Sequence, residues 1–72
     1  WGVKMNISYN KLWKLLIDKK MKKVELKDIA GISSSSLAKL GKNEPVTLEV
    51  LMKICEALEV NIGDIIEFIK KV

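Results

Sequence analysis

The stretch LKDIAGISSSSLAKL, residues 26–40, decides the fold of this 72-residue chain. Its apolar residues recur three or four positions apart, which is the spacing of a helix face: Leu26, Ile29 and Ala30, then Leu37 and Leu40. Gly31 can end the first helix because glycine adopts a left-handed backbone without steric cost. Ser33 is a suitable N-cap for the second helix. Two short helices joined by a glycine turn predict a helix-turn-helix, whose second helix is shaped to enter a DNA major groove.

The remaining sequence predicts three further helices and no strand. Ser8, Thr47 and Asn61 are suitable N-caps for a first helix, a fourth helix and a short fifth helix. Trp13 is expected to anchor the core rather than stack on bases, because leucines accompany it on the apolar stripe of the first helix. We therefore expect an all-α fold, a compact five-helix domain with the helix-turn-helix at helices two and three.

The length of the chain fits a single domain near the lower size limit for folding on an apolar core alone. We expect this domain to span residues 8–69, between an N-terminal tail (1–7) and a C-terminal tail (70–72). Trp1-Gly2-Val3-Lys4 has the character of an upstream or artificial extension, and Met5 is the expected native start.

The charge of the chain is concentrated in its first part. Residues 1–42 hold ten lysines and three acidic residues, a net charge of +7, whereas residues 43–72 have a net charge of −3. Lysines are common on any soluble surface, but these surround the predicted helix-turn-helix. A lysine-rich face suits a polyanion, because each neutralised phosphate releases a condensed counterion.

Several functional classes are disfavoured by composition. The chain has no histidine and one cysteine, Cys55, which we expect to be a small core residue rather than a metal ligand or reactive thiol. Paired carboxylates in an apolar setting and a phosphate-binding loop are also missing, so an enzyme is not expected. No stretch is apolar enough to span a bilayer, and no signal peptide is visible. We expect a cytoplasmic protein without a metal, a cofactor, a small-molecule ligand or a membrane partner.

The order and spacing of several short motifs carry a family resemblance. These motifs are Glu25-Leu26, Ala30-Gly31-Ile32-Ser33, Leu37, Leu40, Pro45-Val46-Thr47-Leu48-Glu49, Leu51, Ile54, Ala57-Leu58 and Asn61-Ile62 through Ile66. The chain resembles the lambda-repressor-like (Cro/Xre) helix-turn-helix domains over roughly residues 8–68.

The resemblance implies roles for particular residues. Base edges are expected to meet Ser34, Ser35 and Lys39, and backbone phosphates are expected to meet Ser33, Lys42 and Asn43. Lys22 and Lys23 are expected to face a further phosphate, because they stand at the N-terminus of the first helix of the helix-turn-helix, which exposes N–H donors.

The sequence also departs from the family pattern. Lys22 and Lys23 stand where relatives commonly have threonine and glutamine, and Lys27 replaces an alanine in the tight contact between the two helices. We expect the Lys27 stem to lie along that contact and its ammonium to be solvated. Glu59 takes a position often held by glycine or asparagine, at some conformational cost. The second helix lacks Arg, Gln and Asn, which form bidentate pairs with bases, so base specificity is expected to be weak.

These observations predict a double-stranded DNA-binding transcriptional regulator, expected to be a repressor that occludes a promoter. One recognition helix offers few base contacts, so a homodimer reading two half-sites is expected. The candidate dimer surface is the apolar segment near the C-terminus, with Ile65, Ile66, Phe68 and Ile69; the alternative is that Phe68 folds back onto the first helix. A protein-interaction module on the same scaffold, such as an antitoxin or a coactivator-type adaptor, is the alternative function.

Overall fold

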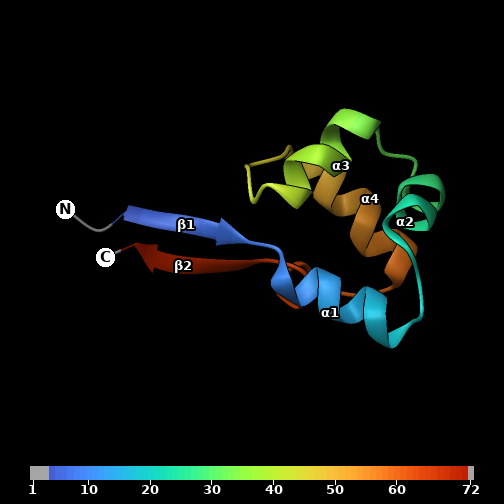
Figure 1. The fold of residues 1–72 in the computed structure, drawn as a ribbon, viewed down its shortest axis with the longest axis horizontal. Helices are drawn as coiled ribbons and strands as arrows, with labels where there is room; N and C mark the ends of the chain where they lie inside the picture. Colours follow the sequence, from blue (N-terminus) through green and yellow to red (C-terminus); the bar gives the residue numbers. More distant parts are fainter. Residues whose placement is uncertain (1–3, 72) are drawn as a thin grey trace.

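The computed structural model describes residues 4–71, which form a helical body and a projecting two-stranded ribbon (Figure 1). The elements follow in the order β1 (Lys4–Ser8), α1 (Asn10–Asp18), α2 (Lys23–Ala30), α3 (Ser34–Gly41), α4 (Leu48–Leu58), the 3-10 turn η1 (Ile62–Asp64) and β2 (Glu67–Lys71). β1 and β2 pair antiparallel, so the first and last described residues lie side by side. The prediction of a helical domain with a helix-turn-helix at α2 and α3 is confirmed.

The core of the body receives apolar side chains from all four helices and from the segments between them. The buried members are Tyr9, Leu12, Leu16, Leu26, Ala30, Ile32, Leu40, Leu51, Ile54, Leu58 and Ile65. Their spacing along α1 and α4 follows the helical period, which is why these two helices each present one continuous apolar face. Trp13 is half-buried against this core, as predicted.

The prediction of five helices and no strand is wrong at both ends of the described chain. The expected fifth helix is the single 3-10 turn η1, and residues 67–71 continue as β2. Part of the predicted N-terminal tail provides the partner strand, in which Asn6 is opposite Ile69 and Ile7 is opposite Phe68. β-Branched and aromatic residues in both segments favour strand pairing. Residues 1–3 and 72 of the predicted tails lie outside the described part.

The helix ends agree with the expected capping at most positions. Ser33 and Thr47 are N-caps whose hydroxyls accept from the N–H groups of Ser36 and Val50, at 3.1 and 3.3 Å. Ser8 instead precedes the N-cap position of α1, and its buried hydroxyl accepts from the N–H of Asn10 at 3.3 Å. These bonds satisfy N–H groups that have no partner within the first helical turn.

Candidate nucleic-acid interface

The turn between α2 and α3 fixes how the second helix is presented. Gly31 ends α2 in the left-handed region with φ +69°, and its N–H donates to the carbonyl of Lys27 at 3.0 Å. Ile32 follows and is buried in the core. The chain then enters α3 at Ser33, so that the first turn of α3 lies on the surface with Ser33, Ser34 and Ser35 exposed.

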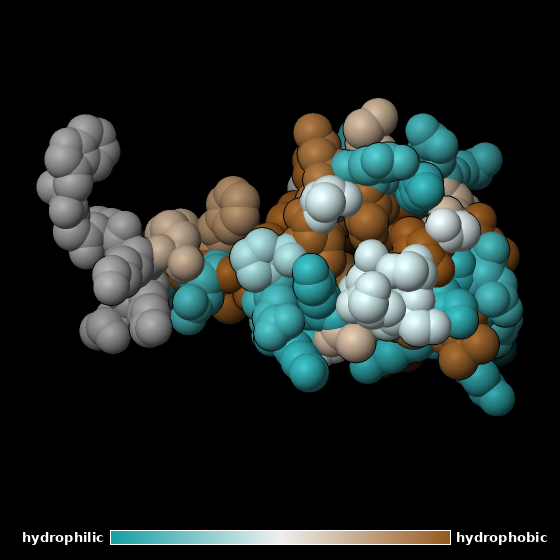
Figure 2. Space-filling view, turned by 90° about the horizontal axis from the view of Figure 1, so that it is seen from above, coloured by the Kyte–Doolittle hydropathy of each residue, from teal (hydrophilic) through white to brown (hydrophobic). Residues whose placement is uncertain are grey.

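Three serine hydroxyls at the start of α3 are hydrogen-bonded to one another. Ser33 Oγ accepts from the backbone N–H of Ser36 and donates to Ser36 Oγ at 3.0 Å. Ser35 Oγ lies 3.0 Å from Ser33 Oγ. Either hydroxyl can be the donor in this contact. α3 lies on the upper side of the body in Figure 1, and this side carries pale surface of intermediate hydropathy among hydrophilic side chains in Figure 2.

Ser34 has a different partner, which reaches it from α2. Lys27 Nζ donates to Ser34 Oγ at 3.1 Å. The Lys27 stem is half-buried between the helices, as expected, but its ammonium is hydrogen-bonded rather than only solvated. Sequence reasoning missed this contact, although the replacement of the usual small residue by lysine was a signal that the position is unusual.

The remaining predicted contact residues of α3 and the following loop lie at its C-terminal end. Lys39 and Lys42 are exposed. Asn43 has φ +55°, and its side-chain Oδ1 accepts from the backbone N–H of Tyr9 at 3.3 Å. The Asn43 carbonyl is therefore used inside the fold, whereas its NH₂ group keeps two donors for a phosphate.

The N-terminus of α2 carries the other two predicted phosphate contacts. Lys22 occupies the N-cap position, and its backbone N–H donates to the Glu25 carboxylate at 3.2 Å. Lys23 Nζ lies over the Trp13 ring, 4.4 Å from its centroid. A cation over an indole face is attracted by the ring quadrupole, so Trp13 positions this ammonium beside the helix terminus.

The predicted dimer residues are divided between core and ribbon. Ile65 is fully buried, so its inclusion in an exposed surface is wrong, and Ile66 is half-buried. Phe68 does not fold back onto α1: it is 65% exposed and lies opposite Ile7 in the ribbon. Because successive strand residues point to opposite faces, Met5, Ile7 and Phe68 share one face of the ribbon and Ile69 lies on the other.

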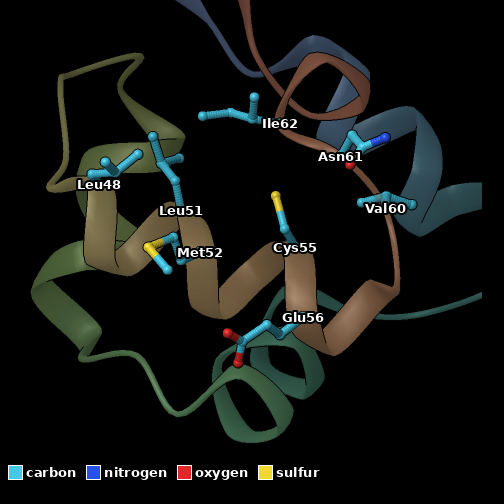
Figure 3. Close-up of a pocket in the computed structure, with 8 residues that line it drawn as sticks. All are labelled: Leu48, Leu51, Met52, Cys55, Glu56, Val60, Asn61 and Ile62. Carbon is cyan, nitrogen blue, oxygen red and sulfur yellow. The ribbon is translucent and has the colours of Figure 1, made fainter.

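A shallow apolar hollow of about 320 Å³ lies between α4 and η1. Its lining residues include Leu48, Met52 and Ile62, all of which are partly exposed, and the Cys55 thiol points toward Ile62 (Figure 3). Leu48 is 64% exposed, because it stands in the first turn of α4 at the edge of the core. Burial, with the nearby Asp64 carboxylate as a second cause, raises the pKa of the Cys55 thiol.

Residues 4–71 contain neither a membrane-spanning helix nor a cluster of metal-binding side chains. No helix in this range is long and apolar enough to cross a membrane. The same residues contain no group of three or more His, Cys, Asp or Glu side chains that could hold a metal ion.

An exposed, lysine-flanked helix presented by a glycine turn is the arrangement of a DNA-binding helix-turn-helix. The chain belongs to the family of Cro/C1-type HTH DNA-binding domains, which matches residues 11–71. It is 39% identical over 56 residues to the uncharacterized HTH-type transcriptional regulator YozG of Bacillus subtilis (strain 168), and this match covers 75% of the present chain and 67% of YozG. Its fold is similar to the crystal structure of the transcriptional regulator VanUg, with a TM-score of 0.89 and 60% identity over 93% of this chain and 89% of that one.

Proposed function

We propose that this protein is a transcriptional regulator that binds double-stranded DNA by placing α3 in the major groove. The observation that carries the proposal is the exposed first turn of α3, with lysines in the preceding helix α2 and its N-cap (Lys22, Lys23 and Lys27) and at the C-terminal end of α3 (Lys39 and Lys42). These cations can neutralise phosphates on either side of the groove, with release of their counterions. Both similar proteins described above are transcriptional regulators by name.

The proposed contacts divide into base edges and phosphates. Ser34, Ser35 and Lys39 are exposed on α3 and are proposed to meet base edges. The proposed phosphate contacts are Lys22, Lys23, Ser33, Lys42 and Asn43. The Ser33 hydroxyl already caps α3, so its contact with a phosphate would be made beside the helix N-terminus, where exposed N–H groups and partial positive charge favour an anion.

A homodimer is part of the proposal, because one short recognition helix reads few base pairs. The ribbon face with Met5, Ile7 and Phe68 is the best candidate for the contact, since Met5 is 52% and Phe68 65% exposed. The opposite face combines Ile69 with the polar Asn6 across from it. The ribbon projects from the body (Figure 1), and Met5, Ile7 and Phe68 line a hollow together with Asn43 and Pro45 of the loop after α3. A dimer bound over a promoter would act as a repressor by occlusion.

A binding titration with the DNA upstream of the protein's own coding sequence, and with a scrambled duplex, tests this proposal. The regulator is expected to prefer the upstream DNA, and Lys39→Ala is expected to reduce that preference. Lys23→Ala should weaken both complexes alike and make the salt dependence shallower by about one phosphate contact. Lys53→Ala removes the same charge from α4 and serves as the control.

An adaptor that binds protein instead of DNA is the second candidate. It is favoured by the absence of Arg, Gln and Asn from α3 and by the exposed apolar residues around the hollow on α4. The same titration separates the two functions. Absence of binding to either duplex at low salt would contradict DNA binding, whereas equal binding to both would remove the sequence-reading role.

A further inference from the structure

The hydrogen bond between Lys27 and Ser34 joins the last turns of α2 to the first residue of α3. Lys27 Nζ and Ser34 Oγ are 3.1 Å apart, and Ser34 is exposed. An ammonium group has three N–H donors and no lone pair. The Ser34 oxygen is therefore the acceptor in this bond, and its own proton must point to a different partner.

The neighbouring serines use their protons inside α3. Ser33 Oγ donates to Ser36 Oγ at 3.0 Å, and the hydroxyls of Ser33 and Ser35 share a second hydrogen bond of 3.0 Å. Within residues 4–71, no hydrogen bond uses the Ser34 proton. A serine hydroxyl ordinarily discriminates poorly between bases, because it can donate or accept. Lys27 occupies one of the two acceptor positions of the Ser34 oxygen, so the Ser34 proton points away from Lys27 and is available as a donor.

We propose that Lys27 and Ser34 act together as a two-donor group that reads guanine in the major groove, with Lys27 as the specificity-determining residue. This inference rests on the proposed DNA-binding function and names the base that the interface prefers. Guanine presents two adjacent acceptors, N7 and O6, which match two donors held side by side.

The other bases fit this pair less well. Adenine presents an acceptor beside an N6–H₂ donor, which opposes a Lys27 N–H and can be paired only by the remaining lone pair of Ser34. Cytosine presents an N4–H₂ donor, and thymine has one acceptor, O4, next to a methyl group. Discrimination thus comes from an unpaired donor at the wrong base as well as from two bonds at guanine.

The position of Lys27 explains why the pair is held in place. Its stem is half-buried in the contact between α2 and α3, which restricts the side-chain conformations that it can adopt. Ser34 lies in the first turn of α3, the part of a recognition helix that approaches base edges. Lys39, by comparison, is exposed, and its ammonium makes no hydrogen bond to another of the described residues.

The test selects bound duplexes from a random DNA pool with the full chain and with two variants, Lys27→Met and Ser34→Ala. Met preserves helix propensity and stem length but removes the donors. The wild type is expected to enrich a guanine at one position of the site. Both variants are expected to lose that preference and to keep the base preferences at the other positions. Lys14→Met, on α1, removes the same charge and should retain the guanine. Circular dichroism confirms that each variant is folded.

Replacement of the enriched guanine by 7-deazaguanine supplies a second measurement, because it removes the N7 acceptor alone. Wild-type affinity is expected to fall at least about fivefold, the lower end of the discrimination of a bidentate pair, and the affinity of Lys27→Met is expected to stay unchanged. Two outcomes would overturn this inference: Lys27→Met keeps the guanine preference, or it loses affinity equally for all duplexes. Neither outcome would contradict the proposed DNA-binding function. Failure of the wild type to bind any duplex at low salt overturns the proposed function and this inference together.

Discussion

The Tyr9 hydroxyl donates a 2.7 Å hydrogen bond to the backbone carbonyl of Glu44, 35 residues further along the chain. The backbone N–H of the same residue donates to Asn43 Oδ1. Tyr9 is fully buried at the start of α1, so these two bonds attach the loop after α3 to the body. The loop that carries Lys42 and Asn43 is thereby held next to the end of the recognition helix.

Replacement of Tyr9 by phenylalanine is expected to lower the free energy of unfolding by about 1 kcal/mol. The aromatic ring stays in the core, but the Glu44 carbonyl loses its donor. Urea denaturation followed by circular dichroism measures the change. A variant as stable as the wild type would show that water satisfies this carbonyl equally well.

The buried phenol also makes stability depend on alkaline pH. Burial raises the pKa of Tyr9 above its ordinary value of 10.0, since the phenolate is disfavoured in the core. Its contribution to stability is therefore complete below pH 10 and is lost as the pH rises through the higher pKa of the folded state. The stability difference between wild type and Tyr9→Phe should shrink above this pH. Tyr9 is the one tyrosine of the chain, so phenolate absorbance reports its pKa directly.

The C-terminal end of α4 offers a stabilising substitution. Glu59 has φ +57°, a left-handed conformation that glycine adopts more easily, which confirms the conformational cost expected there. Glu59→Gly is expected to raise the free energy of unfolding by roughly 0.5–1 kcal/mol. The matched control Glu56→Gly, inside α4, should lower it by about 1 kcal/mol. Changes of the same sign at both positions would contradict this assignment of backbone strain.

Cys55 is expected to react slowly with iodoacetamide in the native protein. The reaction rate of Cys55 in the native protein should rise at a more alkaline pH than its rate in denaturant. The reason is that burial and the Asp64 carboxylate raise the pKa of the native thiol. Asp64→Asn should move the native profile part of the way back, since burial is the larger cause. Superimposable native and denatured profiles would rule out this shift.

Phe68→Thr tests the proposed dimer surface while keeping a residue that favours strands. The variant is expected to sediment as a monomer at concentrations at which the wild type is a dimer. Ile69→Thr changes the opposite face of the same strand and should leave the dimer intact. A dimer that is weakened only by Ile69→Thr would place the contact on the other face.

The parts of the fold that the sequence predicted depend on local signals. Gly31, Ser33 and Thr47 each act on the helix next to them, so their roles could be recognised without knowing the tertiary structure. The same holds for the leucines of α1 and α4, whose period identifies the buried face.

The errors concern contacts between distant segments. Ile65, Ile66 and Ile69 are spaced as on a helix, and the partner that makes residues 67–71 a strand lies 59 to 67 positions earlier in β1. Ile29 falls on the predicted inner face of α2 but is 53% exposed, because the helix turns Leu26 and Ala30 inward. The bond from Lys27 to Ser34 depends on the angle between α2 and α3, which no local pattern specifies.

The register of the ribbon places Lys4 directly opposite Lys71. A short glycine-rich linker between these two ends would close the described chain into a ring, and the connection between α1 and α2 offers an exposed place, near Lys19 and Lys20, at which to open new termini. Such a circular permutant would retain all four helices in their packing. If the permutant still binds DNA, the DNA-binding surface depends on how the helices are arranged in space. It does not depend on their order in the sequence.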